Sequence, residues 1–287
     1  MYRLSYFKFV FIFGYDLIYI SLINGENILF KRNILLILLM ILLTATGCTK
    51  NEQSQDVYKN IIKRDKLIVG TQFDAKPFGY VDKDNKLKGV DVDIAKELAK
   101  RMLGSESKIE FKQVTPSNRI QSITSGEVDL VIATMSITPQ RKAIVNFSLP
   151  YYIAGQAILV GQQSNISGYS DLNNKPVIVI LGTTGEKQLR YFAPKAILKG
   201  YRTYSEGFQA LKNGNAVAIT TDDSILHGFI MDNKNYKILS QRLTQEPYGI
   251  AFKNTEDART LKSNIDRLLN DMRIEGYLNK ICKKWGV

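Results

Sequence analysis

The chain has 287 residues, 45% of them hydrophobic and 23% charged, a composition that is typical of globular proteins and excludes a disordered chain. Its 39 Lys and Arg against 27 Asp and Glu give a net charge of +12. No basic run is interleaved with aromatic residues, so the charge indicates a solvated surface and no nucleic-acid partner. Two cysteines and one histidine without zinc-ligand spacing predict no metal site. The chain also lacks a phosphate-binding loop, a dinucleotide fingerprint and a nucleophile elbow, so we expect no cofactor and no catalytic residue.

Residues 1–47 contain an export signal that does not begin at residue 1. Lys31 and Arg32 precede an apolar run over residues 34–43, which is the order of a signal peptide. The run is too short to span a bilayer, which takes roughly 20 apolar residues. The segment over residues 1–30 is apolar and rich in aromatic residues, but charged residues interrupt it. It could be a first membrane segment. We expect instead that residues 1–28 are not translated.

Small residues follow the apolar run and end at Cys48. This stretch resembles the lipobox of bacterial lipoproteins, although Ala45 stands where that motif usually has leucine. The resemblance implies cleavage before Cys48 and attachment of a lipid to its thiol. A buried N-terminal helix is the alternative, but the tract over residues 48–65 begins as a polar tether, which favours an anchor.

Beyond residue 65, short apolar runs alternate with amphipathic ones. This alternation predicts parallel sheets with crossover helices. The run over 128–134 is rich in β-branched residues and suits a strand buried on both faces. We expect strands at 67–70, 109–112, 128–134, 156–161, 177–181, 216–221 and 248–252, and helices at 90–102, at 118–125 with Ser117 as the cap, from Glu186 onward and at 260–272.

Five blocks of this region match one known family in the family order. They are FDAKPFGYVDKDNKLKGVDVDIAKELAKRM, NRIQSITSGEVDLVIATMSITPQRKAIVNFSLPYY, GTTGE, AITTDDSIL and the terminal KKWGV. Together they resemble the polar amino acid-binding proteins of ABC importers, and the resemblance covers residues 60–287. It implies an α/β, two-lobed type II periplasmic binding fold, in which each lobe is a mostly parallel sheet flanked by helices.

The resemblance also implies how the chain is divided between the lobes. Lobe 1 is expected over residues 66–155, lobe 2 over 156–245, and a return to lobe 1 over 246–287. Two crossing segments near 151–156 and 245–248 would join them.

An α-amino acid is a zwitterion, so its receptor needs a cation, oriented N–H groups and an anion. Arg141 can hold an α-carboxylate with two parallel hydrogen bonds. The resemblance places Thr134 and Ser136 beside it. It places Thr184, with its neighbour Thr183, at a helix N-terminus across the cleft, where free N–H groups bind anions. A phosphate loop is the weaker interpretation of this turn, because no Gly-Lys-Ser/Thr follows it.

Asp222 follows the strand at 216–221 and is the candidate partner of the ligand ammonium. Asp223 is its competitor, although that residue can instead cap the next helix. The ungapped match to the family favours Asp222. A carboxylate and a guanidinium on opposite lobes would let the ligand bridge both and close the hinge.

The side-chain pocket is the least determined part of the site. Arg119 matches an arginine that glutamate- and aspartate-binding relatives direct at the ligand side chain, and a surface helix residue is the alternative. Gln72 stands where some acidic-ligand relatives have a second arginine. Ala75 replaces the aromatic ring of relatives that bind basic amino acids. We therefore expect glutamate or glutamine ahead of aspartate.

Three aromatic residues near the pocket are candidates for its wall. They are Phe73, Phe78 and Tyr80, and core packing is an equal alternative for Phe78.

The expected function is capture of a polar amino acid without catalysis. The protein would be a monomeric lipoprotein on the outer face of the cell membrane, delivering its ligand to an ABC permease. One alternative is an enzyme like cyclohexadienyl dehydratase on the same fold, which needs a general acid in the cleft. The other is a sensory amino acid-binding lipoprotein that serves no importer.

Overall fold

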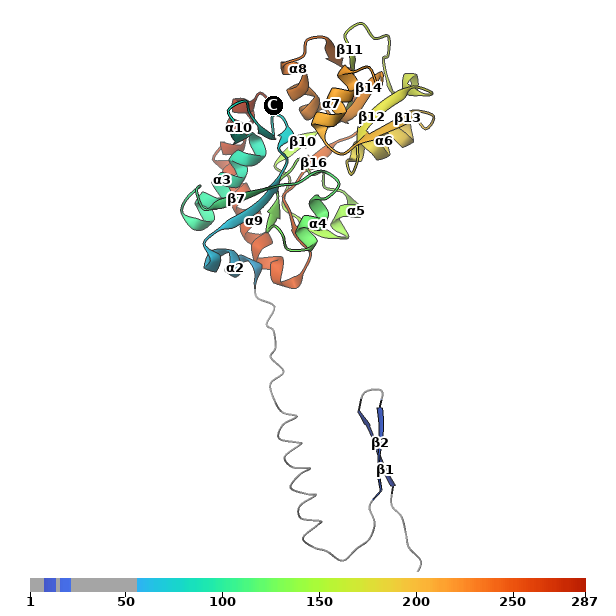
Figure 1. The fold of residues 1–287 in the computed structure, drawn as a ribbon. Coiled ribbons are helices and arrows are strands. Elements are labelled where there is room, and N and C mark those ends of the chain that lie inside the picture. The colour runs from blue at the N-terminus through green and yellow to red at the C-terminus, as the bar shows by residue number, and fades with distance from the viewer. Residues whose placement is uncertain (1–7, 14–15, 22–55) are drawn as a thin grey trace, which may run out of the picture. The chain divides into compact units, whose positions relative to one another are not determined.

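The computed structural model describes residues 8–13, 16–21 and 56–287 (Figure 1). Strands β1 (Lys8–Phe13) and β2 (Asp16–Ser21) form an antiparallel pair in a unit of their own. The predicted signal sequence and Cys48 lie outside the described residues. Within the described residues, no helix has both the length and the apolar character needed to cross a membrane.

Lobe 1 is built on a five-stranded sheet of order β7–β3–β8–β17–β9. Its apolar side chains form two clusters on opposite faces, with Leu130 in one and Val131 in the other. A small sheet of order β4–β5–β6 lies beside it. The strands are β3 (Leu67–Thr71), β4 (Asp74–Ala75), β5 (Gly79–Val81), β6 (Leu87–Lys88), β7 (Ile109–Gln113), β8 (Leu130–Val131), β9 (Val145–Phe147) and β17 (Ala251–Lys253). The helices are α2 (Val57–Arg64), α3 (Val90–Leu103), α4 (Arg119–Thr124), α5 (Pro139–Lys142), α9 (Arg259–Ile274) and α10 (Tyr277–Trp285), with a 3₁₀ turn η2 (Glu256–Ala258).

Lobe 2 repeats this plan with a sheet of order β13–β12–β14–β11–β15. Two apolar clusters again cover the sheet, with Leu159 in one and Ile158 in the other. The strands are β11 (Gln156–Gly161), β12 (Pro176–Ile180), β13 (Ile197–Tyr201), β14 (Ala218–Asp222) and β15 (Tyr236–Ile238). The helices are α6 (Thr184–Phe192), α7 (Tyr204–Lys212) and α8 (Asp223–Met231), with a 3₁₀ turn η1 (Tyr169–Leu172).

Two short strands connect the lobes (Figure 1). β10 (Tyr152–Ala154) and β16 (Glu246–Tyr248) pair antiparallel between the two larger sheets. The ring of Phe78 packs edge-on against Tyr152 and Tyr248, one from each strand, with centroids 5.2 and 5.5 Å away. Aromatic packing from lobe 1 therefore supports both crossing strands.

The α/β two-lobed fold is confirmed, but the expectation of mostly parallel sheets is wrong. In each large sheet the described strands form two parallel and two antiparallel pairs. The antiparallel pairs involve β11 and β17, and each of these strands directly follows a crossing strand. A chain that arrives from the other lobe enters the sheet from the opposite end, which reverses its direction.

Several element bounds also differ from the sequence expectation. The strand predicted at 248–252 is split, because the N–H of Gly249 donates to the carbonyl of Met135 and leaves no continuous ladder. Ser117 is not the cap of α4; that helix begins after Asn118, whose side chain accepts from the N–H of Thr115. The strand expected over 128–134 is reduced to β8, and α6 begins at Thr184, two residues earlier than expected.

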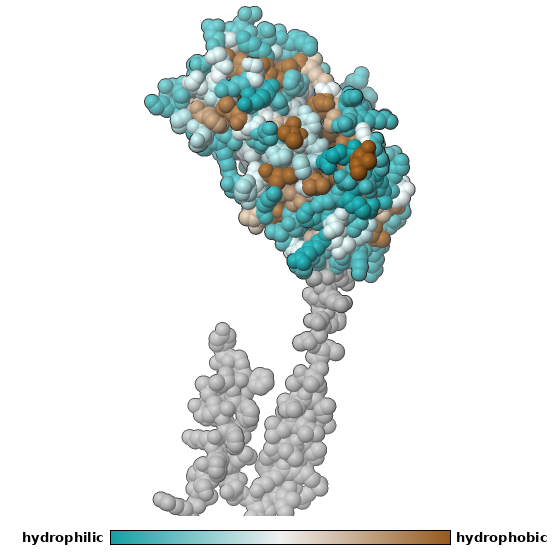
Figure 2. Space-filling view, turned by 180° about the vertical axis from the view of Figure 1, so that it is seen from behind, coloured by the Kyte–Doolittle hydropathy of each residue, from teal (hydrophilic) through white to brown (hydrophobic). Residues whose placement is uncertain are grey.

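The described surface is mostly polar. On the face drawn in Figure 2, apolar residues reach the surface as separate spots among polar ones, which is ordinary for a globular protein.

Candidate functional site

The two lobes touch each other along their facing edges. Nη2 of Arg141 in lobe 1 donates to the carbonyl of Gly182 in lobe 2 at 3.0 Å, and the ammonium of Lys76 lies 2.7 Å from the carboxylate of Asp232. A Cβ placed on Gly182, whose φ is +84°, would lie 2.6 Å from the carbonyl oxygen of Pro116. Only glycine allows this approach, so the structure is a closed arrangement of the lobes.

Arg141 lies on α5, where the hydroxyl of Thr138 caps the helix by accepting the N–H of Arg141 at 3.2 Å. Its Nη1 donates to the carbonyl of Ser136 at 2.7 Å. Burial, followed by the like charge of Arg119, lowers the pKa of the guanidinium to about 9. Among the described residues the hydrogen-bond partners of its guanidinium are carbonyl groups, which are polar but carry no net negative charge.

Arg119 is buried in α4 with only 2% of its surface exposed, so the surface-residue alternative is wrong. Its Nη1 donates to the carbonyl of Ala133 at 2.7 Å, whereas its Nε has no hydrogen-bond partner among the described residues. Burial lowers the pKa of this guanidinium. In the part of the chain that the structure describes, neither Arg119 nor Arg141 forms an ion pair.

Thr134 has the left-handed φ of +45°, which is rare for a β-branched residue. Its N–H donates to the carboxylate of Asp91 at 3.0 Å, and its hydroxyl donates to Oε1 of Gln72 at 2.9 Å. These two bonds turn the chain out of β8. Backbone strain of this kind persists only where the surroundings enforce it, and it is concentrated at functional sites.

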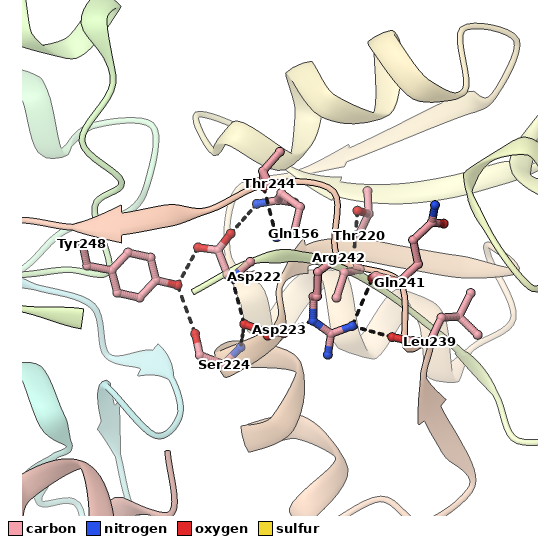
Figure 3. A network of polar contacts seen from close by, with 12 residues as sticks. Gln156, Thr220, Asp222, Asp223, Ser224, Leu239, Gln241, Arg242, Thr244 and Tyr248 are labelled. Atoms are coloured by element: carbon pink, nitrogen blue, oxygen red, sulfur yellow. Dashed lines mark hydrogen bonds and ion pairs between the residues drawn. The ribbon is translucent and has the colours of Figure 1, made fainter. Parts of the chain in front are cut away.

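Asp222 ends β14 and is 5% exposed. The hydroxyl of Tyr248 donates to its Oδ2 at 2.5 Å, and the amide of Gln156 donates to its other oxygen (Figure 3). Burial first, and then the charge of Glu246, raise the pKa of Asp222 to about 7. Its carboxylate is therefore hydrogen-bonded but forms no ion pair with a cation among the described residues.

Asp223 lies beside Asp222 but has a different environment (Figure 3). Its carboxylate lies 2.8 Å from Nε of Arg242. It also accepts the N–H of Gly155 at 3.1 Å and that of Ser224 at 2.7 Å. Asp223 is thus already paired, and it ties α8 to the end of the crossing strand β10.

The N-terminus of α6 begins at Thr183 and receives no side-chain cap. The hydroxyl of Thr183 instead donates to the carbonyl of Ile180 at 2.6 Å. The hydroxyl of Thr184 donates to Glu246 at 3.0 Å and accepts from the amide of Gln156 at 3.2 Å. The first-turn N–H groups of this helix are therefore directed at the interface without a side-chain acceptor.

The remaining predicted residues divide between the interface and the core. Ser136 is buried, and its backbone pairs with that of Tyr248 and accepts from Arg141. Phe73 is partly buried beside Gln72. Phe78 is fully buried in the lobe 1 core, so its core alternative holds, and Tyr80 packs edge-on against Trp285.

Three buried polar atoms lack a hydrogen-bond partner among the described residues and belong to side chains of this interface. They are Nε2 of Gln72, Nε of Arg119 and Oε1 of Gln156. Buried polar atoms are almost always paired, and each exception needs an explanation. Two donors and one acceptor, beside two guanidinium groups and one carboxylate, can bind a small zwitterion that has a polar side chain.

Sequence reasoning missed Gln156, Glu246 and Asp91. Gln156 is a polar residue that opens an otherwise apolar strand, and Glu246 lies inside a predicted crossing segment. Asp91 precedes Ile94 by three residues, so helical periodicity already places it on the apolar face of α3.

Known proteins are similar to this chain over most of its length. The model of the bacterial extracellular solute-binding proteins, family 3, matches residues 67–287. The ABC transporter glutamine-binding protein GlnH of Bacillus subtilis (strain 168) is 38% identical over 243 residues, which cover 84% of this chain and 88% of GlnH.

Two solved structures are similar in fold. An ancestral arginine-binding protein bound to glutamine superimposes with a TM-score of 0.72 at 39% identity, covering 77% of this chain and 98% of that one. The ancestral amino acid-binding protein AncCDT-1, a precursor of cyclohexadienyl dehydratase, has a TM-score of 0.73 at 35% identity, covering 79% and 98%.

The two neighbouring aspartates should respond oppositely to neutralisation. Because the pKa of Asp222 is raised from 3.8 to about 7, the folded protein binds a proton between these values that the unfolded chain has released. Ionised Asp222 therefore destabilises the ligand-free fold as pH rises through this window. We expect Asp222→Asn to raise Tm at pH 8 and to have little effect at pH 4, since Oε1 of Gln156 can accept from the new amide.

Asp223→Asn is the matched control, because it removes an existing ion pair and should lower Tm at both pH values. Thermal unfolding followed by circular dichroism measures both variants. If Asp222→Asn lowered Tm at pH 8 as much as Asp223→Asn does, the ionised carboxylate of Asp222 would stabilise the fold, and the expectation would be wrong.

Proposed function

The chain belongs to the bacterial extracellular solute-binding proteins of family 3, and we propose that it captures glutamine outside the cytoplasm and delivers it to an ABC importer. One observation carries the proposal: Arg141 and Asp222 face the interface from opposite lobes, Asp222 buried and Arg141 partly buried, and neither is in an ion pair among the described residues. A free amino acid supplies the partner that each of them lacks.

The ligand α-carboxylate would bind Arg141 and the uncapped N-terminus of α6. Arg141 already reaches the carbonyl of Gly182 beside that helix, so one carboxylate can contact both groups. The hydroxyl groups of Thr134 and Ser136 line the lobe 1 side. Charge-assisted hydrogen bonds contribute roughly 1.5–3 kcal/mol each, so a few of them suffice for tight binding.

The ligand ammonium would bind Asp222. Oε1 of Gln156 is a second acceptor for it and has no partner among the described residues. Thr183 and Thr184 then complete the lobe 2 side of the site. Asp223 is excluded from this role, because its carboxylate already pairs with Arg242.

An amide side chain fits the remaining groups better than a carboxylate does. Nε of Arg119 and Nε2 of Gln72, with Phe73 beside Gln72, have no hydrogen-bond partner among the described residues and can donate to an oxygen of the ligand side chain. The two guanidinium groups are accompanied by three carboxyl groups, Asp91, Asp222 and Glu246, which offset their positive charge to the extent that they are ionised; burial raises the pKa of both Asp91 and Asp222 to about 7. The glutamine-binding names of B. subtilis GlnH and of a Geobacillus stearothermophilus relative that is 41% identical agree with this choice over glutamate and aspartate.

We infer binding without catalysis. AncCDT-1 is named as a precursor of a dehydratase, which makes an enzyme of that type the second candidate. Here the buried acid that faces the ligand, Asp222, is the natural partner of an ammonium group, which favours a receptor for intact amino acids. The proposed form of this function is a monomer that delivers its ligand to a permease. A sensory lipoprotein that serves no importer would use the same site, so the site does not distinguish the two roles.

We also propose that Cys48 carries a lipid that anchors the protein to the outer face of the cell membrane. The support is the order of Lys31 and Arg32, the apolar run over 34–43 and the small residues before Cys48. Two or more acyl chains hold a protein firmly at a bilayer, whereas one does not.

Mass spectrometry of the protein from its native membrane tests the anchor. We expect an N-terminal Cys48 that carries diacylglycerol, with or without a third acyl chain. An unmodified Cys48 in the membrane fraction would contradict the proposal.

Calorimetry with the common amino acids tests the ligand. We expect glutamine to bind at least about tenfold more tightly than glutamate, aspartate or arginine, a difference of about 1.4 kcal/mol. Glutamine at 100 times its Kd should also stabilise the fold by about 2.7 kcal/mol in thermal unfolding. Tighter binding of arginine or glutamate would overturn the choice of ligand, and prephenate turnover would overturn the absence of catalysis.

Arg141→Ala should abolish binding of glutamine without unfolding the protein. Truncating one member of a buried charge pair commonly costs about 2–5 kcal/mol, so Kd should rise at least about thirtyfold. Lys142→Ala is the control, because it removes the same charge from the next, exposed residue of α5. Affinity of Arg141→Ala within twofold of wild type would remove Arg141 from the site.

A further inference from the structure

One peptide group of the site lies between two buried charges of opposite sign. Nη1 of Arg119 donates to the carbonyl of Ala133 at 2.7 Å. The N–H of Thr134, which belongs to the same peptide group, donates to Oδ2 of Asp91 at 3.0 Å. Both charges polarise this peptide group in the same direction, so it couples the guanidinium to the carboxylate without a direct ion pair.

Asp91 does not present a free atom to the ligand. It lies in the first turn of α3 and is fully buried. Its second oxygen accepts the hydroxyl of Tyr151 at 2.8 Å, so both oxygens are occupied by groups of lobe 1. Any effect of Asp91 on the ligand must therefore pass through Thr134 and Arg119.

Arg119 does present a free donor. Its Nε has no hydrogen-bond partner among the described residues, and neither has Nε2 of Gln72, whose Oε1 accepts from Thr134. An uncompensated guanidinium in this place would attract a side-chain carboxylate. A buried carboxylate on the other side of the same peptide group lowers the positive potential that the guanidinium presents, while the guanidinium keeps its N–H groups, so a neutral acceptor becomes relatively better suited to it.

We propose that Asp91 is the positioning residue that makes this pocket prefer an uncharged amide side chain over a carboxylate, by offsetting the positive potential of Arg119 across the shared peptide group while leaving its donors in place. The inference rests on the proposed function and names the origin of its selectivity. Asp91 acts from behind the pocket wall, so removing its charge changes selectivity and leaves the ligand contacts intact.

Asp91→Asn tests this directly. Asparagine has the same shape, its oxygen can accept the N–H of Thr134, and its amide can donate to the hydroxyl of Tyr151. Calorimetry with glutamine and with glutamate at pH 8.5, above the pKa of about 7 to which burial raises Asp91, gives the ratio of the two Kd values. We expect the preference for glutamine to fall at least about tenfold, mainly through tighter binding of glutamate.

Asp93→Asn is the matched control. It makes the same change two residues further along α3, where the carboxylate accepts Nε1 of Trp285 at 2.8 Å and pairs with Lys284. The ratio should stay at the wild-type value.

Arg119→Gln is the reciprocal test, and it replaces Asp91→Asn if that variant does not fold. The same ratio of Kd values for glutamine and glutamate is measured. The substitution leaves the carboxylate of Asp91 without its cation, so glutamate should lose more affinity than glutamine. Equal changes for both ligands in Asp91→Asn, or in Arg119→Gln, would reduce Asp91 to a structural residue and overturn the inference. Wild-type protein that binds neither ligand would instead overturn the proposed function, and the inference with it.

Discussion

The site depends on keeping buried charges apart. A buried charge without a partner is costly, and a protein normally removes the cost by pairing it. Here Arg141 is held by one lobe and Asp222 by the other, and each is satisfied by neutral groups: carbonyls for the guanidinium, a phenol and an amide for the carboxylate. Had both charges been fixed on one rigid lobe, they would have neutralised each other. Division between two lobes preserves a complementary pair for a ligand that carries both charges.

The crossing strands do more than join the lobes, because their side chains belong to the site. Tyr248 donates to Asp222, and Glu246 accepts from Thr184 at the start of α6. Gln156, the residue that begins β11 after the crossing, contacts both Asp222 and Thr184. In the proposed mode of binding, a ligand that contacts Asp222 would reorganise hydrogen bonds made by the crossing strands themselves, which would couple binding to the position of the hinge.

The sequence was most informative where one periodicity governs a whole element. The apolar spacing of α3 and the unbroken run of β11 predicted their bounds closely. It was least informative where a backbone N–H bonds a residue far away in the sequence and the strand is interrupted. The N–H of Thr134 donates to the carboxylate of Asp91, and the N–H of Gly249 donates to the carbonyl of Met135. The same limit applies to the site. The chemistry of a zwitterion indicates Arg141 and Asp222, whereas the participation of Gln156 and Glu246 depends on how two lobes meet, which no local pattern encodes.

Closure of the lobes depends on how many contacts a ligand can make in the closed and in the open arrangement. In the closed arrangement the guanidinium of Arg141 lies beside Gly182 and the N-terminus of α6, so one carboxylate can contact both lobes at once. With the lobes apart, the same carboxylate can contact only one of them. In this arrangement the carbonyl of Gly182 accepts from Arg141, and a carbonyl is a weaker acceptor than a carboxylate. The ligand thus strengthens an existing interface instead of creating a new one, and its differential affinity for the two states drives the hinge.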